Sequence, residues 1–535
     1  MGLAAHVLFH RIPAKADPLG PDNVLGFVSG LLTGTGSLFT GRWMVTGKSP
    51  LTNGWGEANC GGNFSPAIKR CGVDGIFFKG ISPEPVYLYV DDKTAELRDA
   101  ADIWGKDAVE TESILIDSSE SRNTRVACIG QAGEKLSLIS GVSTDKGRMA
   151  ARSGLGAVMG SKKLKALVLA GTQRIHAHNP NEIKQLSRIC NKWVQFQPPF
   201  LPGILMAFVG ALLRIMPWGV AQDGFLYKIS LRKWGTVCMN QDVESIFYFN
   251  ELLNRAGMDS ISAGHAVAFA FECFEKGILT TAETEGKELK WGDPDAVKYL
   301  IEQMIERKGI GDILADGVKL AAERIGNDSD QLAMHAGGQE PAMHDSRNDP
   351  GFALHYSVEP APGRHTNGAW FYYEMYQLWK TVKNVPRVSY FFIKSSKYKK
   401  DINHAKKSKA NSEYLNVMNG SGICQFGSFL GSRRIRIFEW LNAATGWHFS
   451  PEQYMEIGNN VQQLKHAFNI KHGILPRDNK ACDRLLGIPV QTKGANKGCQ
   501  VDIDVLMEDY WQLFGWDKET GVPCEKTIDK IASIS

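Results

Sequence analysis

Closely spaced cysteines are missing from this chain of 535 residues. Its ten cysteines are scattered, and none has another cysteine within four residues. Secreted domains held by disulfides and compact zinc sites both depend on short, repeated cysteine spacings. The N-terminal residues Met1–His6 also carry no basic start followed by a long apolar run, as a signal peptide would. We therefore expect a cytoplasmic protein.

Long apolar runs and a strong excess of one charge are missing as well. The one candidate for a membrane span, Phe200–Leu213, is apolar for only 14 residues, whereas a spanning helix needs about 20. We predict no membrane span and interpret this run as a buried or interfacial amphipathic helix. The formal net charge is only +4, and no basic motif with interleaved aromatic residues is evident, so nucleic acid is not an expected partner.

One local concentration of charge stands out against this balance. Seven lysines and a single aspartate lie between Lys394 and Lys409. Such a run is typical of a solvated surface segment. It could also attract an acidic, ferredoxin-like electron carrier, because opposite charge steers the encounter of two proteins.

Glycine, by contrast, is abundant near the N-terminus. Of the 55 glycines, 22 fall between Asn23 and Gly171, among runs such as Gly75–Phe78 and Val86–Val90 that are typical of strands. Backbone without a Cβ can approach a ligand closely, and arginine offers a planar fork of donors for phosphate. Glycine turns with nearby arginines therefore suit a large phosphorylated cofactor, although a β domain with purely structural turns explains the composition equally well.

The remainder of the chain has a helical pattern, and its length suggests about three domains. We predict an α+β fold with a β-rich domain over 1–175 and two mostly helical domains over 176–335 and 336–535. Apolar residues recur at helical spacing in several segments. One predicted helix begins at Pro180. The others cover 245–255, 263–277, 295–308, 312–325, 433–445, 451–468 and 505–514.

Several stretches, taken together in order and spacing, resemble a known family. They are Gly30–Gly36, Gly41–Arg42, Lys48–Thr52, Asn59–Gly62, Gly72–Gly75, Arg148–Ala166, Gly257–Ser262, Ala268–Gly277, Glu439–Trp447 and Tyr510–Trp516. This set resembles the aldehyde ferredoxin oxidoreductase family, including its branch of tungsten subunits of class II benzoyl-CoA reductases. The resemblance implies tungsten, or occasionally molybdenum, held by two pterin dithiolenes between a β-rich base domain and two helical domains.

The resemblance also implies which residues of the β-rich domain meet the cofactor. Two arginines would bind the pterin phosphates, and these are Arg42 and Arg152. Two backbone carbonyls would face a magnesium ion that bridges the pterins, and these belong to Asn59 and Ser153. Four glycines would let backbone amides face the cofactor, unless they serve only as turns, and these are Gly61, Gly62, Gly154 and Gly156.

A short pattern occurs twice in the helical part of the chain. Asn254–Asp259 and Asn419–Cys424 both read N-x-x-G-apolar-[D/C]. In the family, two related motifs that begin with aspartate each hold one pterin, so the resemblance makes Asn254, Asp259 and Asn419 pterin ligands. Asparagine donates from its amide where a carboxylate would accept. We therefore expect the affinity for pterin to differ from that of family members with aspartate.

His365 is the predicted catalytic residue. It lies in Pro362–Gly368, where the family keeps a histidine beside the metal, and histidine suits a proton donor or acceptor for a substrate carbonyl. The alternative is an ordinary histidine in a surface loop. His335, His344 and His355 are spaced by 9 and 11 residues, which fits no compact zinc motif, so we interpret them as structural.

The chain departs from the family at its iron–sulfur ligands. Family members bind a 4Fe–4S cluster through a C-x-x-C-x-x-x-C run and one distant cysteine. Cys424 matches the distant cysteine and is the predicted metal ligand, but Cys190 and Cys238 stand alone and the run is missing near Thr236–Val237. We also expect the first strands of the family to be absent, because Gly2–Ala5 resembles the end of a turn. A cluster is therefore doubtful here.

These observations leave three functions open. The first is a tungsten-pterin oxidoreductase that oxidises an aldehyde to a carboxylic acid and passes electrons to a ferredoxin-like carrier. The second is a reductase of an aromatic acyl-CoA with the same cofactor. The third is a shortened, catalytically impaired paralogue that serves as a binding subunit. The chain is expected to act as a homodimer or as a subunit of a larger redox complex.

Overall fold

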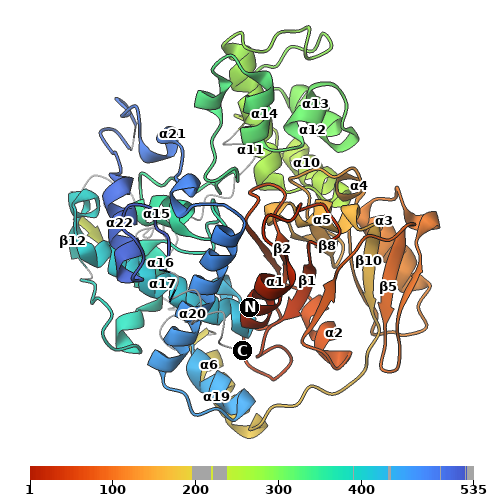
Figure 1. Cartoon of the computed structure of the whole chain (residues 1–535), viewed down its shortest axis with the longest axis vertical. Coiled ribbons are helices and arrows are strands. Elements are labelled where there is room, and N and C mark those ends of the chain that lie inside the picture. The colour runs from red at the N-terminus through yellow and green to blue at the C-terminus, as the bar shows by residue number, and fades with distance from the viewer. Residues whose placement is uncertain are drawn as a thin grey trace.

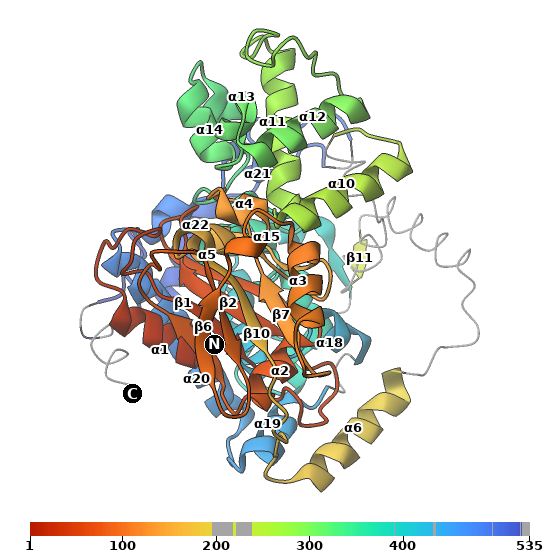
Figure 2. The ribbon, with the colours of Figure 1, turned by 90° about the vertical axis from the view of Figure 1, so that its right-hand side faces the viewer.

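A computed structural model describes residues 1–194, 218–220, 238–389, 391–431, 435–494, 496–524 and 526. Figure 1 shows three groups of elements, with the strands of the first 170 residues beside the helices α15–α22 and below the helices α10–α14. In the view turned by 90°, α10–α14 again stand above the strands (Figure 2). The predicted α+β fold is confirmed.

A four-stranded antiparallel sheet carries the first predicted site residues. Its strands lie in the order β3-β2-β1-β4, and their bounds are β1 Leu25–Ser29, β2 Trp43–Lys48, β3 Trp55–Cys60 and β4 Gly75–Phe78. Every residue of β2 is buried, so both faces of this strand are covered. Phe27 pairs with Val45 on one side and Ile76 on the other, which fixes the register of the sheet.

A six-stranded mixed sheet completes the β-rich part. Its order is β6-β5-β10-β7-β8-β9, in which only β5 and β10 run parallel. The strands are β5 Val86–Val90, β6 Ala95–Asp99, β7 Arg125–Cys128, β8 Val142–Thr144, β9 Arg148–Ala150 and β10 Leu164–Leu169. The helices of this part are α2 Phe64–Arg70, α3 Ala108–Asp117, α4 Gln131–Glu134 and α5 Leu155–Ser161.

The N-terminus forms a helix, which the sequence reasoning did not predict. We expected the end of a turn at Gly2–Ala5, but these residues begin α1 (Gly2–Arg11). Ala4, Ala5 and Leu8 are fully buried, because this face of α1 packs against α20 (Pro451–Lys471). A helix with a buried apolar stripe is stabilised by that packing rather than by its own propensity.

The second group of helices has its own apolar core. Its members are α10 Val243–Ala256, α11 Ser260–Glu275, α12 Pro294–Glu306, α13 Gly309–Leu314 and α14 Val318–Ile325. One prediction was wrong, since 312–325 is not one helix but parts of α13 and α14. Gly317 has a φ of +86°, a left-handed conformation that ends one helix and begins the next.

The third group contains the remaining long helices and a core rich in aromatic side chains. Its helices are α15 Pro350–Val358, α16 Trp370–Tyr376, α17 Ile402–Ser421, α18 Gln425–Gly431, α19 Ile437–Thr445, α20 Pro451–Lys471, α21 Asp483–Leu486 and α22 Ile503–Leu513, joined by α6 Pro180–Val194. The short strands β11 (Trp218–Val220) and β12 (Phe391–Ile393) pair antiparallel.

Two sequence predictions fall outside the described part of the chain. They are the apolar run Phe200–Leu213 and the junction at Thr236–Val237. Among the residues that the structure describes, no helix is both long enough and apolar enough to cross a bilayer.

Candidate functional site

Arg42, immediately before β2, brings together residues from distant parts of the chain. Its Nη2 donates to Asn59 Oδ1 at 2.5 Å and to the Asn59 carbonyl at 3.4 Å. Its Nη1 lies 3.9 Å from Cys424 Sγ, and Asn59 Nδ2 donates to Asn419 Oδ1 at 3.5 Å. The structure therefore brings together four of the predicted site residues, Arg42 itself with Asn59, Asn419 and Cys424.

A pocket opens at this point between β3 and the end of α17. Its polar wall contains the Arg42 guanidinium and the side chains of Asn59 and Asn419, and its other wall is largely apolar. The lining residues are Arg42, Asn59, Thr366, Leu415, Met418, Asn419, Ile423, Gln425 and Phe426. A positive charge beside amide groups suits the phosphate and the hydrogen-bonding edge of a pterin.

Arg152, just after β9, forms a second such group of contacts, and we call Arg42 and Arg152, each with its hydrogen-bond partners, the two arginine nodes. Arg152 begins the short 3₁₀ turn Arg152–Gly154. Its Nη1 donates to Asp259 Oδ2 at 3.0 Å, and its Nη2 donates to the carbonyls of Gly363, at 3.2 Å, and Glu340. Asp259 also caps α11, since its Oδ1 accepts from the backbone N–H of Ile261 at 3.0 Å.

Several polar atoms near Arg152 are buried without a hydrogen-bond partner in the part of the chain that the structure describes. They are Arg152 Nε, His265 Nε2 and Glu340 Oε2. Burial, reinforced by the charge of Arg152, lowers the pKa of His265 to about 4, so this ring is neutral at pH 7. Burial raises the pKa of Glu340. Unsatisfied donors and acceptors of this kind fit a ligand with many hydrogen-bonding groups, such as a pterin.

His365 lies on the loop between α15 and α16, residues 359–369, which we call the His365 loop. This loop contacts both arginine nodes. The Gly363 carbonyl accepts from Arg152, and Thr366 lines the Arg42 pocket. His365 stands between these two positions, is half-buried, and has its ring centroid 5.0 Å from that of His344. The predicted catalytic histidine therefore lies on the segment whose Gly363 carbonyl contacts Arg152 and whose Thr366 lines the Arg42 pocket.

The other histidines do not form a metal site with His365. His355 is buried, and its Nδ1 lies 3.0 Å from Glu359 Oε1. His335 Nδ1 accepts from the backbone N–H of Gly338 at 3.3 Å. Within the described ranges, no group of three or more histidine, cysteine or carboxylate side chains could hold a metal ion.

The remaining predicted cofactor residues have close protein neighbours. A Cβ on Gly61 would lie 3.6 Å from Arg42 Nη1, so Gly61 borders the Arg42 pocket. A Cβ would instead overlap Asp145 at Gly62, the Leu138 carbonyl at Gly154 and the Gly141 backbone at Gly156. Backbone packing thus requires glycine at positions 154 and 156, and a φ of +101° favours it at position 62.

Ser153 and Asn254 also have protein neighbours. The Ser153 N–H donates to Gln339 Oε1 at 3.0 Å, and its carbonyl accepts from Ser49 Oγ at 2.9 Å. The Asn254 side chain faces Gly147, and its carbonyl accepts from the Gly257 N–H. A carbonyl has two lone pairs, so one acceptor position of Ser153 is left for a cation.

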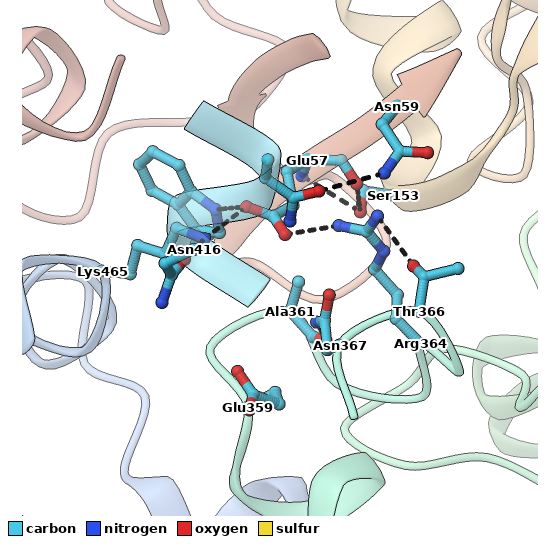
Figure 3. Close-up of polar contacts among 12 residues, drawn as sticks. Glu57, Asn59, Ser153, Glu359, Ala361, Arg364, Thr366, Asn367, Asn416 and Lys465 are labelled. Atoms are coloured by element: carbon cyan, nitrogen blue, oxygen red, sulfur yellow. Dashed lines mark hydrogen bonds and ion pairs between the residues drawn. The ribbon is translucent and has the colours of Figure 1, made fainter. Parts of the chain in front are cut away.

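Sequence reasoning missed a buried ion cluster beside this site. Glu57 on β3 contacts Arg364 Nη1 at 2.5 Å and Lys465 Nζ at 2.7 Å (Figure 3). Burial alone would raise the pKa of Glu57, but Lys465 and Arg364 hold it at about 2. A sequence signal existed, because Lys465 falls on the apolar face of α20 with Val461 and Phe468, where a lysine needs a partner.

The cysteines do not fit a 4Fe–4S cluster. All ten lie in described residues, and none forms a disulfide. Cys190 and Cys238 are buried in different apolar cores, and burial raises the pKa of Cys238 to about 12, which favours the neutral thiol. Such a cluster needs four thiolates, and among the described residues no three or more cysteine, histidine or carboxylate side chains are gathered as metal ligands.

Comparison with known proteins gives a consistent result. Sequence models of the aldehyde ferredoxin oxidoreductase N-terminal domain and of its domains 2 and 3 match residues 1–171 and 218–532. A tungsten-containing aldehyde ferredoxin oxidoreductase of Thermococcus kodakarensis is 30% identical over 585 residues, with 98% of this chain and 93% of the relative covered. The alignment is longer than the chain, so the relative contains residues that this chain does not have.

Two further proteins are more distantly similar. The subunit named aliphatic sulfonate oxidoreductase, WOR-like, of Pyrococcus furiosus is 25% identical, with 99% of this chain and 92% of the relative covered. The solved active-site complex BamBC of benzoyl coenzyme A reductase with 1,5-dienoyl-CoA contains a chain of the same fold. It is 22% identical with a TM-score of 0.76, over 99% of this chain and 92% of that chain. On the domain matches and the 30% identity, this chain belongs to the aldehyde ferredoxin oxidoreductase family.

Proposed function

We propose that this chain is a tungsten-pterin oxidoreductase that oxidises an aldehyde to a carboxylic acid. The carrying observation is that the His365 loop touches both arginine nodes, through the Gly363 carbonyl and through Thr366. This arrangement supports a reaction centre held between two phosphate-binding arginines with one histidine beside it. The relatives named aldehyde ferredoxin oxidoreductase support the choice of an aldehyde.

The residues present fit a cofactor with two pterins. Arg42 with Asn59 and Asn419 would hold one pterin, and Arg152 with Asp259 and Asn254 would hold the other. Asn59 and Ser153 would offer carbonyls to a magnesium ion. When bound, the tungsten centre supplies two-electron redox chemistry; molybdenum would supply the same chemistry.

The chain's own contribution is to place and protonate the substrate. Oxidation adds the oxygen of one water to the aldehyde carbon and releases two electrons and two protons. The N–H of the His365 imidazole would hold a proton at the carbonyl oxygen. The other ring nitrogen of His365, when the ring is neutral, would accept a proton from the attacking water. The apolar wall formed by Leu415, Met418 and Phe426 would receive the hydrocarbon part of the aldehyde.

We further propose three domains over 1–175, 176–335 and 336–535, in line with the separate apolar cores of the α10–α14 and α15–α22 groups. Ten cysteines without a disulfide support a reducing compartment such as the cytoplasm. A ferredoxin-like carrier would receive the electrons. The printed names of the WOR-like subunit and of the BamBC complex support a subunit of a larger redox complex, with a homodimer as the alternative.

The test is the activity of the full chain, purified without oxygen, with a dye as electron acceptor. We expect dye reduction that depends on an aldehyde, and loss of this activity with tungsten retained in His365→Asn. His448→Asn, at an exposed position, is the matched control and should remain active. Activity only with an aromatic acyl-CoA would support the second function, and tungsten binding without turnover would support a binding subunit.

A further inference from the structure

A buried carboxylate lies between two cations that come from other parts of the chain. Figure 3 shows Glu57 with Arg364 on one side and Lys465 on the other. The exposed side-chain fractions are 1%, 3% and 4%. Trp55 Nε1 also donates to Glu57 Oε2 at 2.8 Å. Each carboxylate oxygen is thus engaged in a charged hydrogen bond inside the protein.

The cluster continues into a hydrogen-bond network on the third group of helices. Lys465 Nζ donates to Asn416 Oδ1 at 2.8 Å, and Asn416 Nδ2 donates to Gln462 Oε1 at 2.9 Å. Gln462 Nε2 then donates to Glu359 Oε2 at 2.8 Å. Glu359 is the residue at which α15 ends and the His365 loop begins.

The network therefore holds the His365 loop at two places. Glu359 anchors its start, and Arg364, through Glu57, anchors the position next to His365. Arg364 Nη2 also donates to Thr366 Oγ1 at 3.2 Å. A displacement of Arg364 would move His365 together with the two groups that face the arginine nodes, the Gly363 carbonyl and Thr366.

Charge makes Glu57 indispensable to this arrangement. The positive charges that act on Arg364 include those of Arg42 and Arg152, while Glu57 and Glu359 are the opposing carboxylates. Without the carboxylate of Glu57, Arg364 and Lys465 would be buried cations with no countercharge at this point. An unpaired buried charge is strongly unfavourable, so the guanidinium would leave its place.

We propose that Glu57 is a positioning residue that holds the His365 loop between the two arginine nodes by pairing with Arg364 and Lys465. Glu57 acts through Arg364, without touching the substrate. The inference rests on the proposed function for its effect on catalysis. Its effect on the loop itself is independent of the reaction.

The experiment compares Glu57→Gln with Glu134→Gln in the full chain. Glu134 pairs with Lys165, and both side chains are buried at 6% and 0% exposure, so the control also removes one carboxylate from a buried ion pair. Hydrogen exchange is measured on peptides from 359–369. We expect exchange about tenfold faster in Glu57→Gln, the size expected from a lost charged hydrogen bond, and unchanged exchange in Glu134→Gln.

Kinetics give the second readout. In Glu57→Gln, kcat per bound tungsten with an aldehyde should fall about tenfold, since misplaced catalytic groups lose rate, whereas Glu134→Gln should keep it. If the wild-type chain does not turn over any aldehyde, the proposed function fails, but the exchange data still decide the positioning role. Equal exchange in 359–369 for both variants would overturn the proposal.

A second variant covers the case in which Glu57→Gln does not fold. Glu57→Asp keeps the negative charge but is one methylene shorter, so it cannot reach both Arg364 and Lys465. We expect faster exchange in 359–369 than in the wild type, with a smaller increase than for a lost charge. Exchange equal to that of the wild type in Glu57→Asp would contradict the proposal.

Discussion

Arg42 and Cys424 are 382 positions apart in the sequence, yet Arg42 Nη1 lies 3.9 Å from Cys424 Sγ. Backbone hydrogen bonds hold the two segments together. The Arg42 N–H donates to the Gly422 carbonyl at 3.0 Å, and the Cys424 N–H donates to the Phe39 carbonyl at 2.7 Å. The geometry of the pocket is therefore set by main-chain contacts, and its side chains can be replaced one at a time.

Replacing Arg42 should weaken cofactor binding without unfolding the chain. Arg42→Gln removes the charged donor that we assign to a pterin phosphate, and a charged hydrogen bond contributes about 1.5–3 kcal/mol. We expect tungsten retention after dialysis to fall markedly, as measured by metal analysis. Arg98→Gln, at an exposed position far from the pocket, should retain tungsten as the wild type does, and equal loss in both variants would contradict the assignment.

Asp259 has two roles that two variants can separate. Asparagine caps helices as well as aspartate does, so Asp259→Asn keeps the cap but replaces the Oδ2 acceptor of Arg152 and Ser262 by a neutral amide donor. Asp259→Ala removes the cap of α11 as well, which costs about 1 kcal/mol more. Urea denaturation should therefore rank the wild type above Asp259→Asn and Asp259→Asn above Asp259→Ala. Equal stability of the two variants would show that the cap does not contribute.

The cysteine arrangement predicts the metal content. Protein purified without oxygen should contain tungsten but well below the four irons of a 4Fe–4S cluster, because its four thiolates are not assembled. Cys424→Ser should not change the iron content. About four irons per chain that disappear in Cys424→Ser would contradict the prediction.

Buried histidines should make the protein sensitive to acid. Burial lowers the pKa of His466 from 6.5 to about 4, so the unfolded chain binds this proton more readily than the folded chain. The stabilisation is fully present above pH 6.5 and is lost as the pH falls to about 4; the loss is on the order of 3 kcal/mol. His466→Leu should flatten the pH dependence of unfolding between these values, and a pH dependence equal to that of the wild type would contradict the prediction.

Two glycines in neighbouring helices should respond oppositely to alanine. A Cβ on Gly458 in α20 would overlap the Glu413 carbonyl of α17, so Gly458→Ala should cost about 1–3 kcal/mol. A Cβ on Gly420 in α17 has its nearest neighbour at 3.9 Å, so Gly420→Ala should stabilise the helix by about 0.5–1 kcal/mol. Thermal unfolding measures both, and equal effects would contradict the close packing of α17 on α20.

Local signals account for what could be predicted of the fold. The strands β4 and β5 were recognised because their residues are apolar, β-branched or aromatic and bounded by turn residues. The helix α20 begins at Pro451, as predicted, directly after its cap Ser450, whereas α10 begins two residues before the predicted start at 245, directly after its cap Asp242. The helix α1 was missed because its stability depends on packing against α20, which no pattern within residues 2–11 encodes.

The site was predictable only where a motif marks it. Motif resemblance pointed to Arg42, Arg152 and His365, and the structure brings their surroundings together. Glu57 was not found, because its importance depends on Arg364 and Lys465, which lie 307 residues or more away in sequence. Pairing over such distances is a property of the tertiary structure.

The contact between Arg42 and Cys424 also constrains biosynthesis. A ribosome completes the β-rich part long before it reaches the end of α17, so the growing chain presents one half of the pocket alone. The pocket can therefore be complete only after translation has passed Phe426, its last lining residue. Until then Arg42 has its partner Asn59 from the same sheet but lacks the wall that α17 and the residues after it contribute.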